Sequence, residues 1–318
     1  MFFPIAGIEV APWIPPLVAF VISFCTSMGG VSGAFLLLPF QMSFLGYTHP
    51  SVSATNQVFN IVAIPSGVYR YWREGRMVWP LTWIVIAGTL PGVFVGAFVR
   101  VAYLPNPRHF KLFAACVLLY IAVKMIRDNL KGRATARAAS LDGKGAGDAG
   151  GAAKSAGTGA SEDESAWRTR VTHFNLKRMG YTYRGESYDV SLWGILVLSA
   201  VVGVVGGIYG IGGGSIIAPF FVTVFGLPVH TVAGAALMGT FVTSVAGVVF
   251  YQAIAPFYPG LSVAPDWMLG ILFGAGGMAG MYLGARCQKF VSAHAIKWML
   301  TGIMALTATK YILEFLGY

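Results

Sequence analysis

Long uncharged apolar runs divide this chain into ten segments, five before a polar insert and five after it. They lie near residues 15–28, 33–47, 50–70, 79–103, 109–127, 191–208, 214–227, 229–252, 266–285 and 295–316. The runs are continuous rather than alternating, which is typical of membrane helices and not of an outer-membrane barrel. Only 11% of the residues are charged, whereas a soluble domain carries about 25%. We therefore expect an all-α polytopic membrane protein embedded in a lipid bilayer.

The two series of segments repeat one another. The stretch "GGVSGAFLLLPF" (29–40) aligns with "YGIGGGSIIAPF" (209–220) at an offset of about 180 residues. At this offset Gly67 meets Gly247 and Tyr71 meets Tyr251. Such self-similarity indicates an internal duplication. We expect a first transmembrane repeat over residues 1–128 and a second over residues 190–318.

Basic residues change sides between the repeats. The loop "RYWREGR" (70–76) carries three arginines, whereas its counterpart at 252–266 carries no basic residue. Because cytoplasmic loops are enriched in Lys and Arg, the first should face the cytoplasm and the second the outside. This reversal predicts inverted repeats, as in many secondary transporters, with both termini outside. Four full crossings per half in parallel orientation remain the alternative.

The first two segments of each half are short. Segments 15–28 and 33–47 would each rise about 20 Å, less than the ~30 Å hydrocarbon core. We expect a re-entrant hairpin or broken helix that turns at glycines, followed by three spanning helices. Further glycines spaced by four residues predict closely packed helices. They are Gly88, Gly92, Gly96, Gly276, Gly280 and Gly284.

The polar insert at 129–189 should be cytoplasmic. Residues 131–165 are rich in Gly, Ala and Ser and predict a disordered linker. Residues 167–190 alternate better and predict a small hairpin against the membrane face. Half of the 22 basic residues lie between Arg127 and Arg184. Because they flank apolar spans, we interpret them as a cytoplasmic loop rather than a nucleic-acid surface.

The glycine-rich breaks are the candidate binding site. A helix break is tolerated in lipid where it is buried in protein or lines a wet cavity. Half-helix N-termini offer free N–H groups and a partial positive charge, which suits a small anion. Ser32 and Ser215 stand at cap-like positions. The expected contacts are Gly30, Ser32, Gly33, Gly212, Gly213, Gly214 and Ser215. The alternative is that these glycines serve turning and packing alone.

Neutral polar residues on the following helix of each repeat would complete the site. They are Asn56, Gln57, Asn60, Thr240, Thr243 and Ser244. Hydrogen bonding between helices is the alternative role. Acidic residues lie in loops or at the edges of the apolar runs, as Asp266 and Glu314 do, so no buried carboxylate is expected to carry protons or cations within the membrane. The three cysteines lack metal-ligand spacing, and we expect no catalytic residues, cofactor or metal. Lys124 and Lys310 should snorkel to the interface.

The second-half motif, "GIGGGSIIAP" followed by "GLPVHTVAGAALMGT", resembles the TauE/SafE family. The first half departs from it, with "MGGVSGAFLLLP" and "ATNQVFN". The resemblance implies a permease of the bacterial inner membrane that exports sulfite, thiosulfate, organosulfonates or related anions. Export also suits the inside-negative potential, since each negative charge moved outward gains about 2.3 kcal/mol per 100 mV. A cation-coupled importer and a non-transporting anchor subunit of a sulfur-metabolism enzyme are the alternatives.

Overall fold

The computed structural model describes residues 1–28, 32–73, 75, 77–142, 169–175, 177–183, 186–287 and 293–316. The first half contains α1 (Ile14–Met28), α2 (Ala34–Ser43), α3 (Ser51–Ala63), α4 (Pro65–Arg73), α5 (Trp79–Ala102) and α6 (Pro107–Asp142). The second half contains α7 (Leu192–Tyr209), α8 (Gly214–Phe225), α9 (Val229–Ile254), the 3-10 turn η2 (Ala255–Phe257), α10 (Trp267–Cys287) and α11 (Ala293–Leu316).

Two small sheets accompany the helices. Strands β1 (Phe2–Phe3) and β2 (Ile8–Glu9) pair near the N-terminus. Strands β3 (Arg170–Phe174), β4 (Arg178–Tyr183) and β5 (Glu186–Ser191) form an antiparallel sheet with β4 in the middle. The protein is mostly helical, as expected, and the two small sheets are the exceptions. The predicted hairpin at 167–190 is a three-stranded sheet, because its alternating sequence continues through a third strand.

The helix lengths differ from the predicted pattern at two places. Among the described residues, four helices are long and apolar enough to cross a membrane, namely Trp79–Ala102, Leu192–Tyr209, Thr231–Phe257 and Trp267–Gly284. Helix α7, predicted to be short, has 18 residues and rises about 27 Å. The predicted single helix over 50–70 is divided into α3 and α4 at Pro65, which lacks an N–H and crowds the preceding turn.

The polar insert begins later than its composition suggests. Helix α6 has 36 residues and continues to Asp142. It therefore includes the start of segment 131–165, which we expected to be a linker throughout. Ala, Arg and Leu in this stretch favour a helix, so α6 is extended rather than ended. Residues 143–165 lie outside the described part of the chain.

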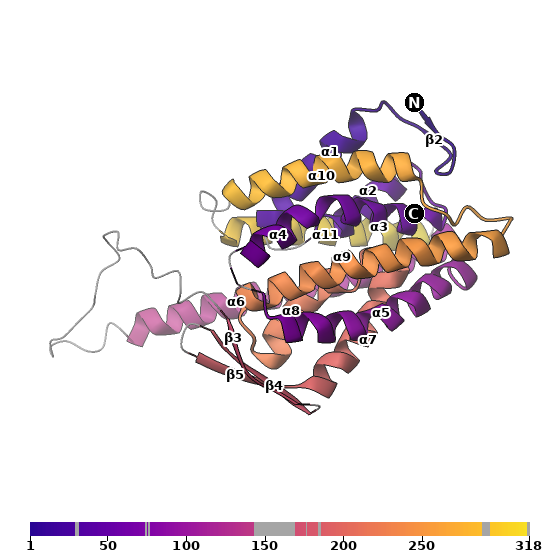
Figure 1. Cartoon of the computed structure of the whole chain (residues 1–318). Helices are drawn as coiled ribbons and strands as arrows, with labels where there is room; N and C mark the ends of the chain where they lie inside the picture. The colour runs from indigo at the N-terminus through magenta and orange to yellow at the C-terminus, as the bar shows by residue number, and fades with distance from the viewer. Residues whose placement is uncertain are drawn as a thin grey trace.

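Close helix packing confirms the predicted role of the spaced glycines. Helices α5 and α7 pack together, and so do α1 and α10, which lie side by side in Figure 1. A Cβ atom on Gly92 would lie 2.4 Å from the Ala200 carbonyl oxygen of α7. A Cβ atom on Gly280 would lie 2.3 Å from the Phe20 carbonyl oxygen of α1. The backbones approach so closely that a side chain has no room.

Helices α3 and α9 cross each other in opposite directions. Gln57 of α3 lies against Gly247 of α9, and Asn60, one turn later, bonds Ser244, one turn earlier. Farther along, Leu237 lies against Gly67 of α4. Along this series of contacts the residue numbers increase in the first half and decrease in the second. This antiparallel crossing brings the predicted polar residues of both halves together.

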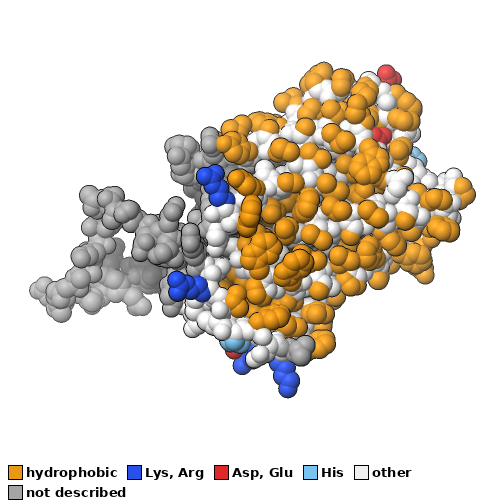
Figure 2. All heavy atoms as spheres, in the orientation of Figure 1, with side chains coloured by type: hydrophobic (Ala, Val, Ile, Leu, Met, Phe, Trp, Pro, Cys, Tyr) orange, Lys and Arg blue, Asp and Glu red, His pale blue; other side chains and the backbone are white. Residues whose placement is uncertain are grey.

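The two ends of the molecule differ. Figure 1 shows the N- and C-termini towards one end of the helices and the sheet β3–β5 at the other. The sheet contacts α9, where Tyr181 Oη and Thr231 Oγ1 are 2.8 Å apart. Just before the sheet, Thr169 Oγ1 donates to the Met77 carbonyl, which precedes α5. On the face shown in Figure 2, apolar side chains cover the middle and the visible Lys and Arg side chains gather towards the sheet end.

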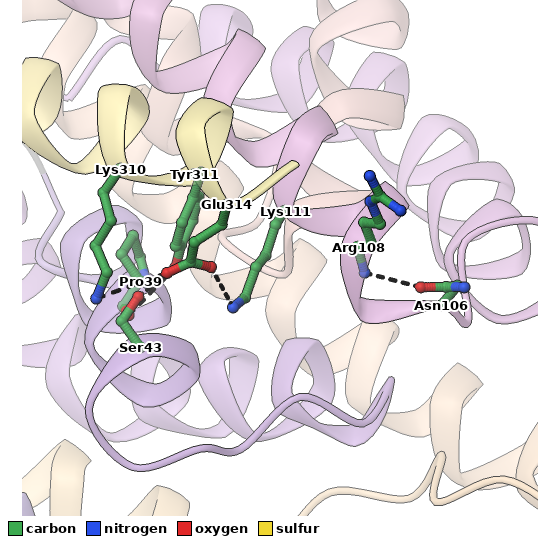
Figure 3. A network of polar contacts seen from close by, with 8 residues as sticks. All are labelled: Pro39, Ser43, Asn106, Arg108, Lys111, Lys310, Tyr311 and Glu314. Carbon is green, nitrogen blue, oxygen red and sulfur yellow. Dashed lines mark hydrogen bonds and ion pairs between the residues drawn. The ribbon is translucent and has the colours of Figure 1, made fainter. Parts of the chain in front are cut away.

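Helix α11 anchors the short helix α2 (Figure 3). Tyr311 Oη donates to the Pro39 carbonyl at 3.3 Å and accepts from Ser43 Oγ at 3.3 Å. Glu314 forms an ion pair with Lys111 of α6 at 2.6 Å. The Lys310 Nζ atom lies 3.7 Å from Glu314, and its side chain is half exposed, consistent with the predicted snorkelling. The Lys124 Nζ atom is instead buried over the Phe220 ring, so the same prediction is wrong for Lys124. Helix α2 is thus held by the last helix of the chain, α11.

Replacing Gly92 with alanine should lower the stability of the protein. The new methyl group would collide with the α7 backbone, and overpacking of this kind costs roughly 1–3 kcal/mol. Gly302 of α11 is the matched control, because a Cβ atom added there would have no other atom within 4 Å. Thermal unfolding in detergent should show a lower midpoint for Gly92→Ala than for Gly302→Ala. Equal midpoints would contradict the close packing of α5 on α7.

Candidate functional site

The break between α7 and α8 explains the run of glycines. Gly210 and Gly212 have φ angles of +79° and +72°, a conformation that glycine adopts readily and other residues rarely do. Gly214 packs so closely on α9 that a Cβ atom would lie 2.0 Å from the Ala236 carbonyl oxygen. A Cβ atom on Gly213 would lie 2.7 Å from the Cβ of Thr89. Turning and close packing therefore both require glycine here.

Side chains of α3 and α9 donate hydrogen bonds to the carbonyl groups around this break. A helix end leaves its last carbonyls without partners, and a buried orphan carbonyl is costly. Four carbonyls accept hydrogen bonds, namely Gly207 from Tyr251 Oη (3.3 Å), Ile208 from Ser53 Oγ (3.2 Å), Gly210 from Asn56 Nδ2 (3.1 Å) and Ile211 from Asn60 Nδ2 (3.0 Å). Interhelical hydrogen bonding, one of the two predicted roles, is thus what Asn56 and Asn60 do in this arrangement.

Asn60 also joins the two broken regions. Its Oδ1 accepts from Ser32 Oγ at 3.2 Å, and its Nδ2 lies 3.4 Å from Ser244 Oγ of α9. Asn56 donates to the Ala34 carbonyl in the first turn of α2 at 2.9 Å. The same two amides therefore contact the start of α2 and the turn before α8. The structure brings these predicted residues together at one place.

The helix starts differ from the predicted caps. Ser32 Oγ accepts from the Ala34 backbone N–H at 3.3 Å, but the N-cap residue of α2 is Gly33, so Ser32 lies one residue before the cap. Helix α8 begins at Gly214, so Gly213 is its N-cap and Ser215 lies inside the helix. The expectation that Ser215 caps α8 is wrong, because the turn at Gly212 starts the helix earlier. Gly30 and the Ser215 side chain lie outside what the structure describes.

Gly33 matches Gly213 in position and in packing. It is the N-cap residue of α2, and a Cβ atom there would lie 2.8 Å from Ser23 Oγ of α1. A Cβ atom on Gly213 would likewise lie 3.1 Å from the Gly203 Cα of α7. Each short helix therefore starts close against the helix that precedes it. The N-cap residue of α8 is a glycine and makes no side-chain cap hydrogen bond.

The hydroxyl groups of α9 are arranged differently from the amides of α3. Thr240 Oγ1 donates to the Ala236 carbonyl at 2.8 Å, one turn earlier in the same helix. Thr240 and Ser244 still line the break, because a Cβ atom on Gly212 would lie 3.0 Å from each of them. Thr243 bonds the carbonyls of Gly239 and Thr240 within α9. Its hydrogen bonds therefore do not place it at either break.

Gln57 is the predicted residue whose polar atoms are unused. Its side chain is fully buried, and neither Nε2 nor Oε1 has a hydrogen-bond partner in the described part of the chain. It lies against Gly247, where a Cβ atom would be 2.2 Å from Oε1. A buried amide without partners costs free energy, so it calls for an explanation. A ligand at the α3–α9 crossing would supply the missing partner.

One buried cation was not expected from the sequence. Arg100 of α5 is fully buried, although it stands in the last turn of its helix. The available signal was its spacing, because it follows Gly88, Gly92 and Gly96 by a further four residues. A residue at that spacing lies on the same helix face as the glycines. It therefore belongs to the face of α5 that packs on α7.

The site is closed in this structure and consists of neutral groups. Ser32 is 3% exposed, and Asn56, Gln57, Asn60, Thr240, Thr243 and Ser244 are 0% exposed. Among the described residues, no group of three or more His, Cys, Asp or Glu side chains could hold a metal ion. Amide, hydroxyl and backbone N–H donors are suited to hold a small anion by hydrogen bonds.

Asn60→Ala should destabilise the protein. The substitution leaves the Ile211 carbonyl and the Ser32 hydroxyl without this partner, and each buried orphan group costs about 1–3 kcal/mol. Thr309→Ala is the control, because Thr309 is exposed on α11 and bonds only its own helix. Thermal unfolding in detergent should separate the two variants clearly. An Asn60→Ala midpoint equal to that of the control would show that the amide does not hold the break.

Comparison with known proteins identifies the family of this chain. A family model described as Sulfite exporter TauE/SafE matches residues 16–311. The Probable membrane transporter protein YdhB of Bacillus subtilis (strain 168) is 25% identical over 120 residues, which cover 38% of this chain and 46% of that protein. The aligned region is thus less than half of that relative. No solved structure matches the chain significantly. Because the family model spans both halves and both breaks, the chain belongs to the TauE/SafE sulfite exporter family of membrane transporters.

Proposed function

We propose that this transporter exports sulfite, thiosulfate or an organosulfonate across the bacterial inner membrane by alternating access. The observation that carries the proposal is the asymmetry of the break before α8. Its carbonyl groups accept hydrogen bonds from α3 and α9, whereas the N-cap residue of α8, Gly213, is a glycine and makes no side-chain cap. In this proposal the carbonyl end is neutralised and the N–H groups at the start of α8 face the anion. A small anion is the ligand that this arrangement favours.

In this proposal the predicted residues divide between two tasks. Asn56 and Asn60 fix the shape of the break through the carbonyls that they bond. The glycines at 212–214 bring the α8 backbone to the anion, and Gln57 contributes an unused amide. Each neutral hydrogen bond contributes only about 0.5–1.5 kcal/mol net. Weak binding of this kind suits a carrier that must release its substrate on the other side.

Inverted repeats account for the packing of the two halves. Equivalent helices of repeats in the same orientation would run parallel, yet α3 and α9 cross in opposite directions. At the repeat offset α10 corresponds to α5 and α1 to α7, and the packing of α10 on α1 is equivalent to that of α5 on α7. With the insert at 129–189 in the cytoplasm, both termini would lie outside, in keeping with the opposite ends seen in Figure 1. Two broken helices facing each other at mid-membrane are suited to alternating access.

The membrane potential supplies the driving force in this mechanism. The interior of a bacterial cell is negative, and outward movement of one negative charge gains about 2.3 kcal/mol per 100 mV. The acidic residues nearest the apolar runs, Asp266 and Glu314, lie at the edges of those runs and have protein partners, so the proposal gives neither a coupling cation. The proposal therefore assigns export without a coupling ion. An importer driven by a cation gradient would need that cation for flux.

Flux in proteoliposomes tests the proposed function directly. Vesicles containing the full chain are loaded with labelled sulfite, thiosulfate or methanesulfonate, and a potassium diffusion potential is set. We expect efflux of at least one anion that accelerates when the interior is made negative, and no efflux from protein-free vesicles. Flux that requires a sodium gradient would favour the importer. Absence of flux for all three anions would contradict the permease.

Gln57→Leu should separate transport from stability. At the repeat offset Gln57 corresponds to Leu237, which packs against Gly67 as Gln57 packs against Gly247. Leucine therefore fits, and it removes two unpaired buried polar atoms, so the unfolding midpoint should stay equal or rise. The apparent affinity for the anion should fall several-fold, about the value of one hydrogen bond. A KM equal to that of the wild type would show that Gln57 does not contact the anion.

A further inference from the structure

We propose that Arg100 forms a second anion-binding station, beside the break that follows α7 and nearer the end of the molecule that carries the termini. It would bind the oxyanion group of the substrate on its way out. This inference rests on the proposed function and names a charged side chain for it. The neutral groups at the break would take up the anion first. The arginine would offer it a full positive charge on the exit side.

The packing of α5 places Arg100 next to the end of α7. Gly96, one turn earlier on the same face, is so close to α7 that a Cβ atom would lie 2.8 Å from the Ile208 nitrogen. The Arg100 guanidinium lies 3.8 Å above the ring of Phe110, and that ring is 6.5 Å from the ring of Tyr209. Tyr209 is the last residue of α7. The guanidinium is therefore a neighbour of the break itself.

The guanidinium has an unused edge. Its Nη1 donates to the Leu104 carbonyl just beyond α5, whereas Nε and Nη2 have no hydrogen-bond partner among the described residues. The side chain is 0% exposed. Within the same described part it forms no ion pair with a carboxylate. A buried cation without a counter-ion is costly and rare, and such residues in membrane proteins commonly mark ion pathways.

The buried carboxylate of Asp266 has other partners. One of its oxygens accepts from the Leu269 N–H at 3.1 Å, in the first turn of α10, and the other accepts from the Ala6 N–H at 3.3 Å. It thus stabilises the start of α10 and the N-terminal segment. Asp266 therefore does not explain why Arg100 is buried. An incoming anion would supply the missing negative charge.

The free edge matches the geometry of a sulfur oxyanion. Nε–H and one Nη2–H of a guanidinium point in the same direction and bind two oxygens of one acid group side by side. Sulfite, thiosulfate and sulfonates all carry two or more oxygens on one sulfur atom. Arginine remains charged at any physiological pH. The station would therefore bind such an anion whatever the pH on either side of the membrane.

A purely structural role predicts different behaviour. Arg100 could serve only to satisfy the Leu104 carbonyl and to stabilise the C-terminal ends of α5 and α7. In that case its loss would lower stability and leave anion affinity unchanged. The two roles are separated by measuring binding and unfolding on the same variants. Arg108, which is exposed at the same end and bonds the Phe315 carbonyl, provides the matched control (Figure 3 labels its position).

The experiment uses the full chain in detergent, with sulfite and methanesulfonate as probes in calorimetric titrations. For Arg100→Gln we expect a Kd at least about tenfold higher than that of the wild type, since a hydrogen-bonded charge is lost. Arg100→Lys keeps the charge without the two-pronged edge and should show an intermediate Kd. Arg108→Gln should bind as the wild type does. In liposomes KM should follow the same order.

Unchanged Kd and KM in Arg100→Gln would overturn the station, even if the unfolding midpoint falls. If Arg100→Gln does not fold, Arg100→Lys decides, because wild-type affinity in that variant would equally overturn the two-pronged contact. The permease stands or falls separately. Wild-type flux with no effect at Arg100 contradicts the station alone, whereas arginine-dependent binding without flux in the wild type supports the station and contradicts the permease.

Discussion

An interrupted helix inside an apolar bundle must find partners for its freed backbone groups, and the rest of this structure depends on that requirement. Each unpaired group in a lipid-embedded interior costs several kcal/mol. Around the break before α8, donors from two other helices supply the partners. The polar face of α3 is therefore a condition for the break. The glycines at 210–214 in turn let α3, α5 and α9 approach closely enough to provide it.

This requirement connects the fold to the chemistry of transport. A break has a negative carbonyl end and a positive N–H end, and an anion site needs the first one neutralised. Asn56 and Asn60 do this for the carbonyls of Gly210 and Ile211. They also contact the start of α2, so the same two side chains link both broken regions. In the proposed alternating-access mechanism, these contacts would couple the two halves.

Features that depend on local spacing could be predicted from the sequence. The short helices α2 and α8, the hydrogen bond of Ser32 at the start of α2 and the packing of the spaced glycines all follow from neighbours a few residues apart. The hairpin in the insert was found, although its third strand was not. The predicted start of α8 is wrong by one or two residues. Both the left-handed Gly212 and the polar Ser215 are compatible with a helix start, and the sequence does not choose between them.

Features that depend on distant partners could not be predicted. The polar residues of α3 were expected at the site, but the sequence left open whether they meet a ligand or other helices. The carbonyls they bond are 154 and 151 residues away in the chain. Arg100 was missed for the same reason. An arginine in the last turn of an apolar helix resembles an interfacial residue, and its burial arises from packing against Phe110 of the next helix.

The location of the bound anion tests this account most directly. Selenite has the same shape and charge as sulfite, and its selenium atom can be located by anomalous scattering. In crystals of the full chain grown with selenite, we expect the selenium signal at the N-terminus of α8, beside the Gln57 amide, or beside the Arg100 guanidinium. A signal confined to exposed lysines and arginines at the molecular surface, with both of these positions empty at saturating selenite, would contradict the account.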